Sequence, residues 1–298
     1  MAQSWISLTT DYGLTDGFVA ACHGVLARLA PQARIIDVTH LIPAADVRRG
    51  AAVLAQTVPY LPWGVHVAVV DPGVGTDRRG VGLATPGGFL VGPDNGLLVD
   101  AALALGGIGA AVELTDPRWL ASRVSRTFHG RDVFAPVAAR LAGGDPLAAA
   151  GPAVDPDTLV RLPTPTVRAD TDGLTAEVST VDHFGNVQLA APAALLDALP
   201  PTLTVTGHPA APARAGFPAA PARAGQPAAP ARAGQPAAPA RAGQPAVRGE
   251  TFADAGHGEL VVYGDSADRV AIAVNGGRAV DLLAVTPGDL LTVSARSR

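Results

Sequence analysis

The first half of the chain alternates short apolar runs with segments in which apolar residues recur at helical spacing. Strands are predicted at residues 5–9, 35–38, 65–70, 81–84, 89–91 and 111–114. One helix is predicted between each pair of successive strands among the first three, and the second of these helices begins at Asp46. A further helix is predicted from Asp132 to about Gly143. Both aspartates are placed at helix starts because aspartate is a common N-cap residue. The β-α-β-α-β order predicts a mostly parallel sheet flanked by helices.

The pattern changes beyond residue 160. Residues 151–166 are rich in proline and are expected to form a linker. After them, apolar and polar residues alternate with period two, which predicts strands at 175–182, 187–189, 203–205, 260–263, 269–274 and 290–293. We therefore predict an α/β domain over residues 1–160 and a smaller, antiparallel β-sheet or barrel domain over residues 168–298.

A repeat interrupts the second domain. The nine-residue unit Pro-Ala-Ala-Pro-Ala-Arg-Ala-Gly-(Phe/Gln) occurs four times between Pro209 and Gln244. Two prolines per unit exclude a helix or a central strand, and the unit has little apolar bulk to bury. We expect a disordered, exposed loop at a hairpin tip. A repeat solenoid and a partner-binding tract are the alternatives.

Composition excludes several classes of function. All 22 basic residues are arginine, which excludes Schiff-base enzymes and P-loop nucleotidases that depend on lysine. The net charge of −4 gives no electrostatic footprint for nucleic acid, and no apolar run is long enough to span a membrane. The single cysteine, Cys22, fits a cytoplasmic protein with a small buried thiol. No grouping of histidine, cysteine and carboxylate residues shows metal-ligand spacing, so no metal site is expected.

Polar loops follow several of the predicted strands, at Asp11, at 71–79, at 94–95 and at 129–132. In a parallel sheet such loops can meet at one edge, where a carboxylate, a guanidinium and an imidazole could orient a water molecule. Each has a simpler structural interpretation as well. Asp71 suits a tight turn, and His129 suits a hydrogen-bonded residue at a helix start.

The motifs together resemble one family, the S-adenosyl-L-methionine (SAM) hydrolases, also called SAM hydroxide adenosyltransferases, which are related to fluorinases and chlorinases. The resemblance rests on six ordered motifs, TTDYGLTD, VVDPGVGT-x-R, GPDNGLL, TFHGRDVFAPVAA, VDHFGNV and AIAVNGG. It covers nearly the whole chain outside residues 209–244.

The resemblance implies an α/β domain, a β-barrel domain and a homotrimer with active sites between subunits. It implies that water attacks C5′ of the SAM ribose, which yields adenosine and L-methionine without a cofactor. By motif match, Asp71, Arg78 and His129 would activate the water, Arg78 being preferred to Arg79. The residues expected to bind substrate are Asp11, Asp182, Asn186, Phe252, Ser266 and Asn275.

Three residues depart from the patterns of the relatives. They are Ala45 where a bulky aromatic is common, Gln188 where the halogenases have an aromatic, and Ala267 where they have an arginine. These departures concern SAM affinity rather than the class of reaction. A non-catalytic SAM- or adenosine-binding protein is the alternative, and a halogenase is less favoured because Asp71 would repel a halide.

Overall fold

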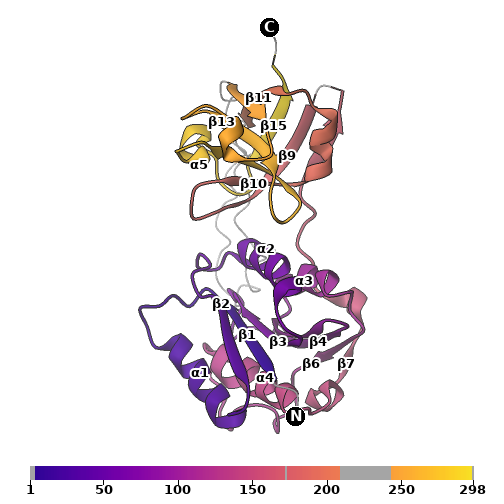
Figure 1. Ribbon diagram of the computed structural model, residues 1–298. Coiled ribbons are helices and arrows are strands. Elements are labelled where there is room, and N and C mark those ends of the chain that lie inside the picture. The colour runs from indigo at the N-terminus through magenta and orange to yellow at the C-terminus, as the bar shows by residue number, and fades with distance from the viewer. Residues whose placement is uncertain (1–3, 172, 209–242, 297–298) are drawn as a thin grey trace, which may run out of the picture. The chain divides into compact units, whose positions relative to one another are not determined.

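The computed structural model describes residues 4–171, 173–208 and 243–296 and divides the chain into two compact units, Met1–Pro163 and Thr164–Arg298 (Figure 1). The predicted disorder of the repeat concerns residues 209–242, which lie outside the described residues. Gln244, the last residue of the repeat, already belongs to a strand.

The first unit contains a seven-stranded sheet in the order β2-β1-β3-β5-β4-β6-β7. Its strands are β1 (Trp5–Thr10), β2 (Arg34–Thr39), β3 (Gly64–Val69), β4 (Gly80–Thr85), β5 (Gly88–Pro93), β6 (Ala110–Glu113) and β7 (Ala153–Val154). β2, β1, β3 and β5 are mutually parallel, as the βαβ pattern predicts, while β4 and β7 run antiparallel to their neighbours. The sheet is therefore mixed.

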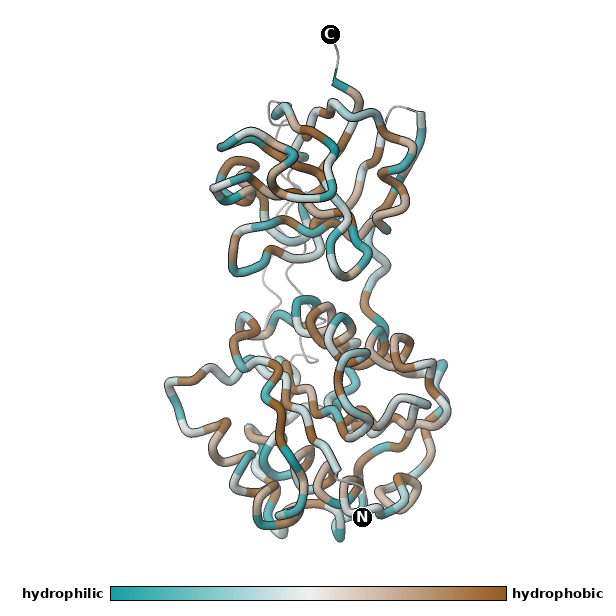
Figure 2. Tube along the Cα trace, viewed as in Figure 1, coloured by the Kyte–Doolittle hydropathy of each residue, from teal (hydrophilic) through white to brown (hydrophobic). Residues whose placement is uncertain are grey.

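Helices pack on both faces of this sheet. They are α1 (Phe18–Leu29), α2 (Val47–Thr57), α3 (Val99–Ala104) and α4 (Ala135–Ala142), with short helical turns at Val58–Tyr60, Gly130–Phe134, Leu147–Ala150 and Pro156–Thr158. Val67 and Val69 of β3 share one apolar core with residues of α1 and α4, while Ala68 and Val70 share another with α2 and α3. Every residue of β3 is buried. Brown, hydrophobic segments run through this unit in Figure 2.

The two predicted helix caps have different outcomes. Asp46 caps α2, because its carboxylate accepts a hydrogen bond of 2.9 Å from the Arg49 N–H. The prediction for Asp132 was wrong: this residue lies inside a π-helical turn that precedes α4, and its carboxylate accepts from the Ser125 N–H instead. Among the described residues, the helices all fall short of the length and apolarity that crossing a membrane requires.

The second unit is a closed β-barrel. Its strands are β8 (Val167–Asp170), β9 (Gly173–Val181), β10 (Val187–Pro192), β11 (Thr202–His208), β12 (Gln244–Arg248), β13 (Leu260–Gly264), β14 (Arg269–Val274) and β15 (Leu290–Ala295). Seven of these strands form a barrel that is closed by the pairing of β9 with β10. The eighth strand, β8, pairs with β9. The unit also has a short helix α5 (Ala279–Leu283) and turns at Ala193–Ala198 and Phe252–Asp254. Alternate residues of β9 point into the core, as the period-two pattern predicts.

The strands on either side of the repeat form a hairpin. β11 and β12 pair antiparallel, with Val205 opposite Gln244 and Thr202 opposite Val247. β12 was not among the predicted strands, since Pro245 and the adjoining repeat obscure its pattern. β12 also pairs parallel with β13, so the barrel is not wholly antiparallel.

Candidate functional site

Three candidate loops of the first unit lie at one edge of the sheet. β1, β3 and β5 are parallel, so their carboxyl ends meet there, and Asp11, Asp71 and Asp94 follow them. The Asp11 N–H donates to the Val69 carbonyl (3.4 Å), and the Asn95 side-chain amide donates to the Val70 carbonyl (2.8 Å). These contacts tie the loops after β1 and β5 to the end of β3.

The loop after β3 turns back so that Arg78 meets Asp71. Arg78 Nε lies 3.0 Å from each carboxylate oxygen of Asp71, and Nη2 also donates to Oδ2. The side chains are 11% and 5% exposed, respectively, so this is a buried ion pair. The turn requires glycine at position 75, where φ is +79° and a Cβ atom would collide with the Arg126 carbonyl.

The neighbouring arginine has a different partner. Arg79 Nε and Nη2 donate to Asp94 Oδ2 at 2.9 and 2.6 Å, and Nη2 also donates to the Thr158 carbonyl. Arg79 thus ties the loop after β3 to the loop after β5. The structure separates the two adjacent arginines, and it is Arg78 that reaches Asp71.

His129 completes the set. Its Nδ1 atom lies 2.7 Å from Arg78 Nη2. A guanidinium only donates, so Nδ1 must accept and the ring proton of the neutral imidazole lies on Nε2. Burial, followed by the nearby charge of Arg78, lowers the pKa of His129. The neutral form is therefore favoured, with Nε2–H as a donor.

Tight packing around Gly130 fixes the position of His129. The rings of Tyr12, Phe18 and Phe128 form edge-to-face or tilted contacts with centroids 5.2–6.0 Å apart. A Cβ atom at residue 130 would overlap the Tyr12 hydroxyl, so only glycine fits beside His129. Burial also raises the pKa of Tyr12, which keeps its hydroxyl protonated.

Asp11 is oriented by the backbone of the loop after β2. Its Oδ2 atom accepts a hydrogen bond of 2.9 Å from the N–H of Ala45. Ala45 is exposed and has a φ of +64°, an unusual conformation for a residue other than glycine. The contact to Asp11 uses the backbone of Ala45, so the absence of an aromatic side chain there leaves it intact.

In the second unit, Asp182 and Asn186 come together in the turn between β9 and β10. The Asn186 N–H donates to Asp182 Oδ1 and its side-chain amide donates to Oδ2, both at 2.8 Å. The Gly185 N–H donates to the Asp182 carbonyl, which closes the turn. Asn186 is therefore more than a turn residue, since its amide fixes the orientation of a carboxylate.

The remaining predicted residues each have local partners. Phe252 is half exposed and packs edge-on against Tyr263, with centroids 5.4 Å apart. The Asn275 amide donates to the Ala255 carbonyl (2.8 Å), and Ser266 lies exposed in the turn between β13 and β14. The structure does not gather these three residues into one hydrogen-bonded group like that around Arg78.

The turn that contains Ser266 holds a contact that the sequence did not indicate. Asp265 Oδ1 accepts from the Ala267 N–H at 2.9 Å, and Oδ2 accepts from the Gln188 side-chain amide at 2.6 Å. Two of the positions that depart from the relatives therefore meet at Asp265. Gln188 also accepts hydrogen bonds from Ser179 and Thr180, so it is fixed from several sides.

Comparisons with known proteins agree with the motifs. Residues 6–151 match the profile of the SAM hydroxide adenosyltransferase N-terminal domain, and residues 232–292 match that of its C-terminal domain. A protein named (R)-S-adenosyl-L-methionine hydrolase from Salinispora arenicola is 65% identical over 98% of both chains. A fluorinase from Nocardia brasiliensis is 31% identical, with 61% of this chain and 69% of the other covered.

The fold has a counterpart among solved structures. A conserved protein from Thermotoga maritima, described as uncharacterized, superposes with a TM-score of 0.79 and 32% identity, over 97% of this chain and 99% of that one. Both domain profiles match in order, and the similarity to the Salinispora protein extends over nearly the full length. With its two domain types and its motifs in the expected positions, this chain belongs to the SAM hydroxide adenosyltransferase family.

Proposed function

We propose that the protein hydrolyses SAM to adenosine and L-methionine by attack of water on C5′ of the ribose. The observation that carries the proposal is the buried arrangement in which Arg78 bridges Asp71 and His129. Family membership and the 65% identity to a protein named as a SAM hydrolase support it.

The atoms, charges and protons of the proposed reaction balance with Asp71, Arg78 and His129 as the only protein groups involved. The water oxygen forms a bond to C5′ while the C5′–S bond breaks, and the electron pair leaves with sulfur as the neutral thioether of methionine. One proton is released from water. Arg78 only donates, and His129 has its acceptor nitrogen occupied by Arg78, so the Asp71 carboxylate is the group that accepts the proton. Arg78 stabilises the developing hydroxide.

The reaction as proposed needs no cofactor, because a sulfonium is already a good leaving group. The protein's contribution is to align water with the C5′–S bond. A halide nucleophile is disfavoured, since the buried carboxylate of Asp71 would lie beside it. The second candidate is a SAM- or adenosine-binding protein without catalysis. Such a protein would have no need of the bridged set around Arg78.

We assign substrate contacts by the family motifs. Asp11 accepts hydrogen bonds from the ribose hydroxyls, and its support by the Ala45 N–H leaves further acceptor positions open on a carboxylate. In the second unit the residues that contact the adenine and methionine ends are Asp182, Asn186, Phe252, Ser266 and Asn275.

We also propose that the chain forms a homotrimer in which neighbouring subunits complete each site. Exposed apolar side chains near Asp11 support an interface there: Leu14 and Leu41 are 66% and 67% exposed. Light scattering on the purified protein tests this, and a monomer would contradict it.

A cytoplasmic location is proposed too, because the single cysteine is a buried free thiol. Cell fractionation checks it.

The decisive experiment incubates the protein with SAM in H₂¹⁸O and follows the products by mass spectrometry. We expect L-methionine and adenosine that carries ¹⁸O at the 5′ position. This product should be lost in Asp71→Asn and retained in Asp77→Asn, a matched change at an exposed position of the same loop. Unlabelled adenosine, or methylthioadenosine, would contradict attack at C5′. Bound SAM without turnover would favour the binding protein.

A further inference from the structure

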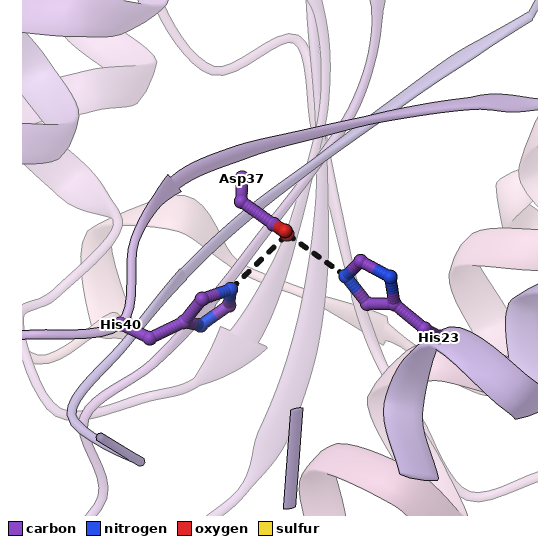
Figure 3. Close-up of side chains that lie close together, drawn as sticks. All are labelled: His23, Asp37 and His40. Atoms are coloured by element: carbon purple, nitrogen blue, oxygen red, sulfur yellow. Dashed lines mark hydrogen bonds and ion pairs between the residues drawn. The ribbon is translucent and has the colours of Figure 1, made fainter. Parts of the chain in front are cut away.

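A second group of chemically versatile side chains lies outside the set around Arg78. His23 comes from α1, Asp37 from β2, and His40 from the residue after β2 (Figure 3). Their ligand atoms all lie within 4.8 Å of one another. His23 Nε2 is 2.9 Å from Asp37 Oδ1, and His40 Nε2 is 3.1 Å from the same oxygen. Both imidazole edges face one carboxylate oxygen.

The Nε2 atom of His40 is a buried polar atom without a hydrogen bond. The His40 side chain is only 4% exposed, and its Nε2 approaches Asp37 without hydrogen-bond geometry. Burial of an unsatisfied polar nitrogen costs free energy, so native structures rarely keep one without a reason. This orphaned nitrogen points toward the cluster. A metal ion there would satisfy its lone pair.

The distances and the ligand types fit a divalent transition metal. A tetrahedral zinc ion with ligand bonds of about 2.0–2.1 Å separates its ligand atoms by about 3.3 Å, and the two measured separations are a few tenths of an ångström shorter. Two imidazoles and one carboxylate are a common zinc set. His23 and Asp37 are 35% and 40% exposed, which leaves the fourth position to a water molecule.

The hydrogen bond made by the other ring nitrogen of His40 supports the same interpretation. A metal-binding histidine normally donates its other ring N–H to a nearby acceptor. His40 Nδ1 lies 2.8 Å from Thr10 Oγ1, so an Nδ1–H tautomer would donate to Thr10 and leave Nε2 free to bind the ion. Thr10 is buried at the end of β1 and directly precedes Asp11.

We infer that His23, Asp37 and His40 form a structural site for a divalent transition metal, with Zn²⁺ the best match, that anchors the loop of Asp11. The ion joins α1 to the end of β2. The His40 carbonyl accepts a hydrogen bond from the Gly13 N–H (2.8 Å), and the His40 imidazole contacts Thr10. His40 therefore holds both ends of the loop that contains Asp11. The site takes no part in the attack on SAM and does not depend on the proposed function.

The test is zinc binding to the full chain, purified without a polyhistidine tag and stripped with a chelator. Calorimetry with Zn²⁺ alone should show one saturable site per chain, and zinc should raise the midpoint of thermal unfolding. His23→Gln and Asp37→Asn change partly exposed residues, so these variants should fold, which circular dichroism checks. We expect at least tenfold weaker binding in each, and no change in His257→Gln, which removes one exposed histidine from the second unit.

Cobalt gives an independent readout. Co²⁺ bound by two imidazoles and a carboxylate in a tetrahedral site produces intense visible absorption, which should appear in the wild type and disappear in His23→Gln. Absence of saturable zinc binding would overturn the proposal. So would equal affinity in His23→Gln, Asp37→Asn and His257→Gln. The three side chains would then be a hydrogen-bonded cluster only.

Discussion

The two units organise their candidate residues in different ways. In the first unit, Asp71 and Arg78 of one loop meet His129, which lies 51 residues beyond Arg78, and the three form one buried, hydrogen-bonded set. In the second unit, Asp182 and Asn186 pair within a single turn, and Phe252 packs in a separate place against Tyr263. The first arrangement is preorganised for chemistry, whereas the second offers separate groups suited to recognition.

The same substitution in both units would test this contrast most strongly. Asp71→Asn removes the only proposed proton acceptor, so kcat should fall by about a thousandfold, or about 4 kcal/mol of transition-state stabilisation. Asp182→Asn should instead raise KM about tenfold and leave kcat nearly unchanged, because it removes a binding contact. Steady-state kinetics on SAM measures both. Similar losses of kcat in the two variants would break the contrast.

Low pH should lower the free energy of unfolding of the first unit, because the unit contains a buried histidine. Burial lowers the pKa of His66 from 6.5 to about 4. Between these values the unfolded chain binds a proton that the folded chain does not, so stability falls as pH decreases from about 6.5 to about 4. The full effect is roughly 3 kcal/mol.

Tryptophan fluorescence follows this effect selectively, because Trp5, Trp63 and Trp119 all lie in the first unit. The Ser7 hydroxyl lies 2.9 Å from His66 Nδ1. Urea unfolding should show a smaller pH dependence in His66→Gln, because a glutamine amide can replace this hydrogen-bond partner but cannot titrate in this range. An identical pH profile in the two proteins would refute the role of His66.

The smallest expected effect concerns the packing beside His129. Gly130→Ala places a methyl group against the Tyr12 hydroxyl and should destabilise the protein by about 1–3 kcal/mol, with a loss of activity. Gly24→Ala is the matched control, since among the described residues a Cβ atom placed there has no heavy atom within 4 Å apart from its chain neighbours and the backbone of its own helix. It should stabilise α1 by about 0.5–1 kcal/mol. Calorimetric unfolding compares them, and equal midpoints would contradict the packing argument.

The sequence predicted the parallel strands and the barrel because their apolar patterns are set locally. The resemblance also selected Arg78 over Arg79, a choice that periodicity alone could not make. Only the fold shows the reason: Arg79 turns to Asp94 and Arg78 to Asp71. The proton position on His129 likewise depends on a donor 51 residues away in sequence.

The sequence did not indicate the proposed metal site of His23, Asp37 and His40, and the local geometry of β2 explains why. In a regular strand, residues three apart face opposite sides. The pairing of β1 with β2 is irregular here, because Leu8 lies opposite Asp37 and Thr9 opposite Thr39, which leaves Val38 as an extra residue. Such a bulge re-aims the side chains that follow it. The sequence pattern does not reveal the bulge, so the meeting of Asp37 and His40 could not be predicted.

The hairpin of β11 and β12 has a consequence for engineering. Its strands hold the two ends of the repeat segment side by side, with Val205 opposite Gln244. Joining two fixed ends through a loop costs only about 0.6 kcal/mol more for each doubling of loop length. Adding or removing one nine-residue unit therefore changes the chain length between two ends that the barrel itself holds in place. The same position is a natural point at which to graft a foreign domain whose own termini lie close together.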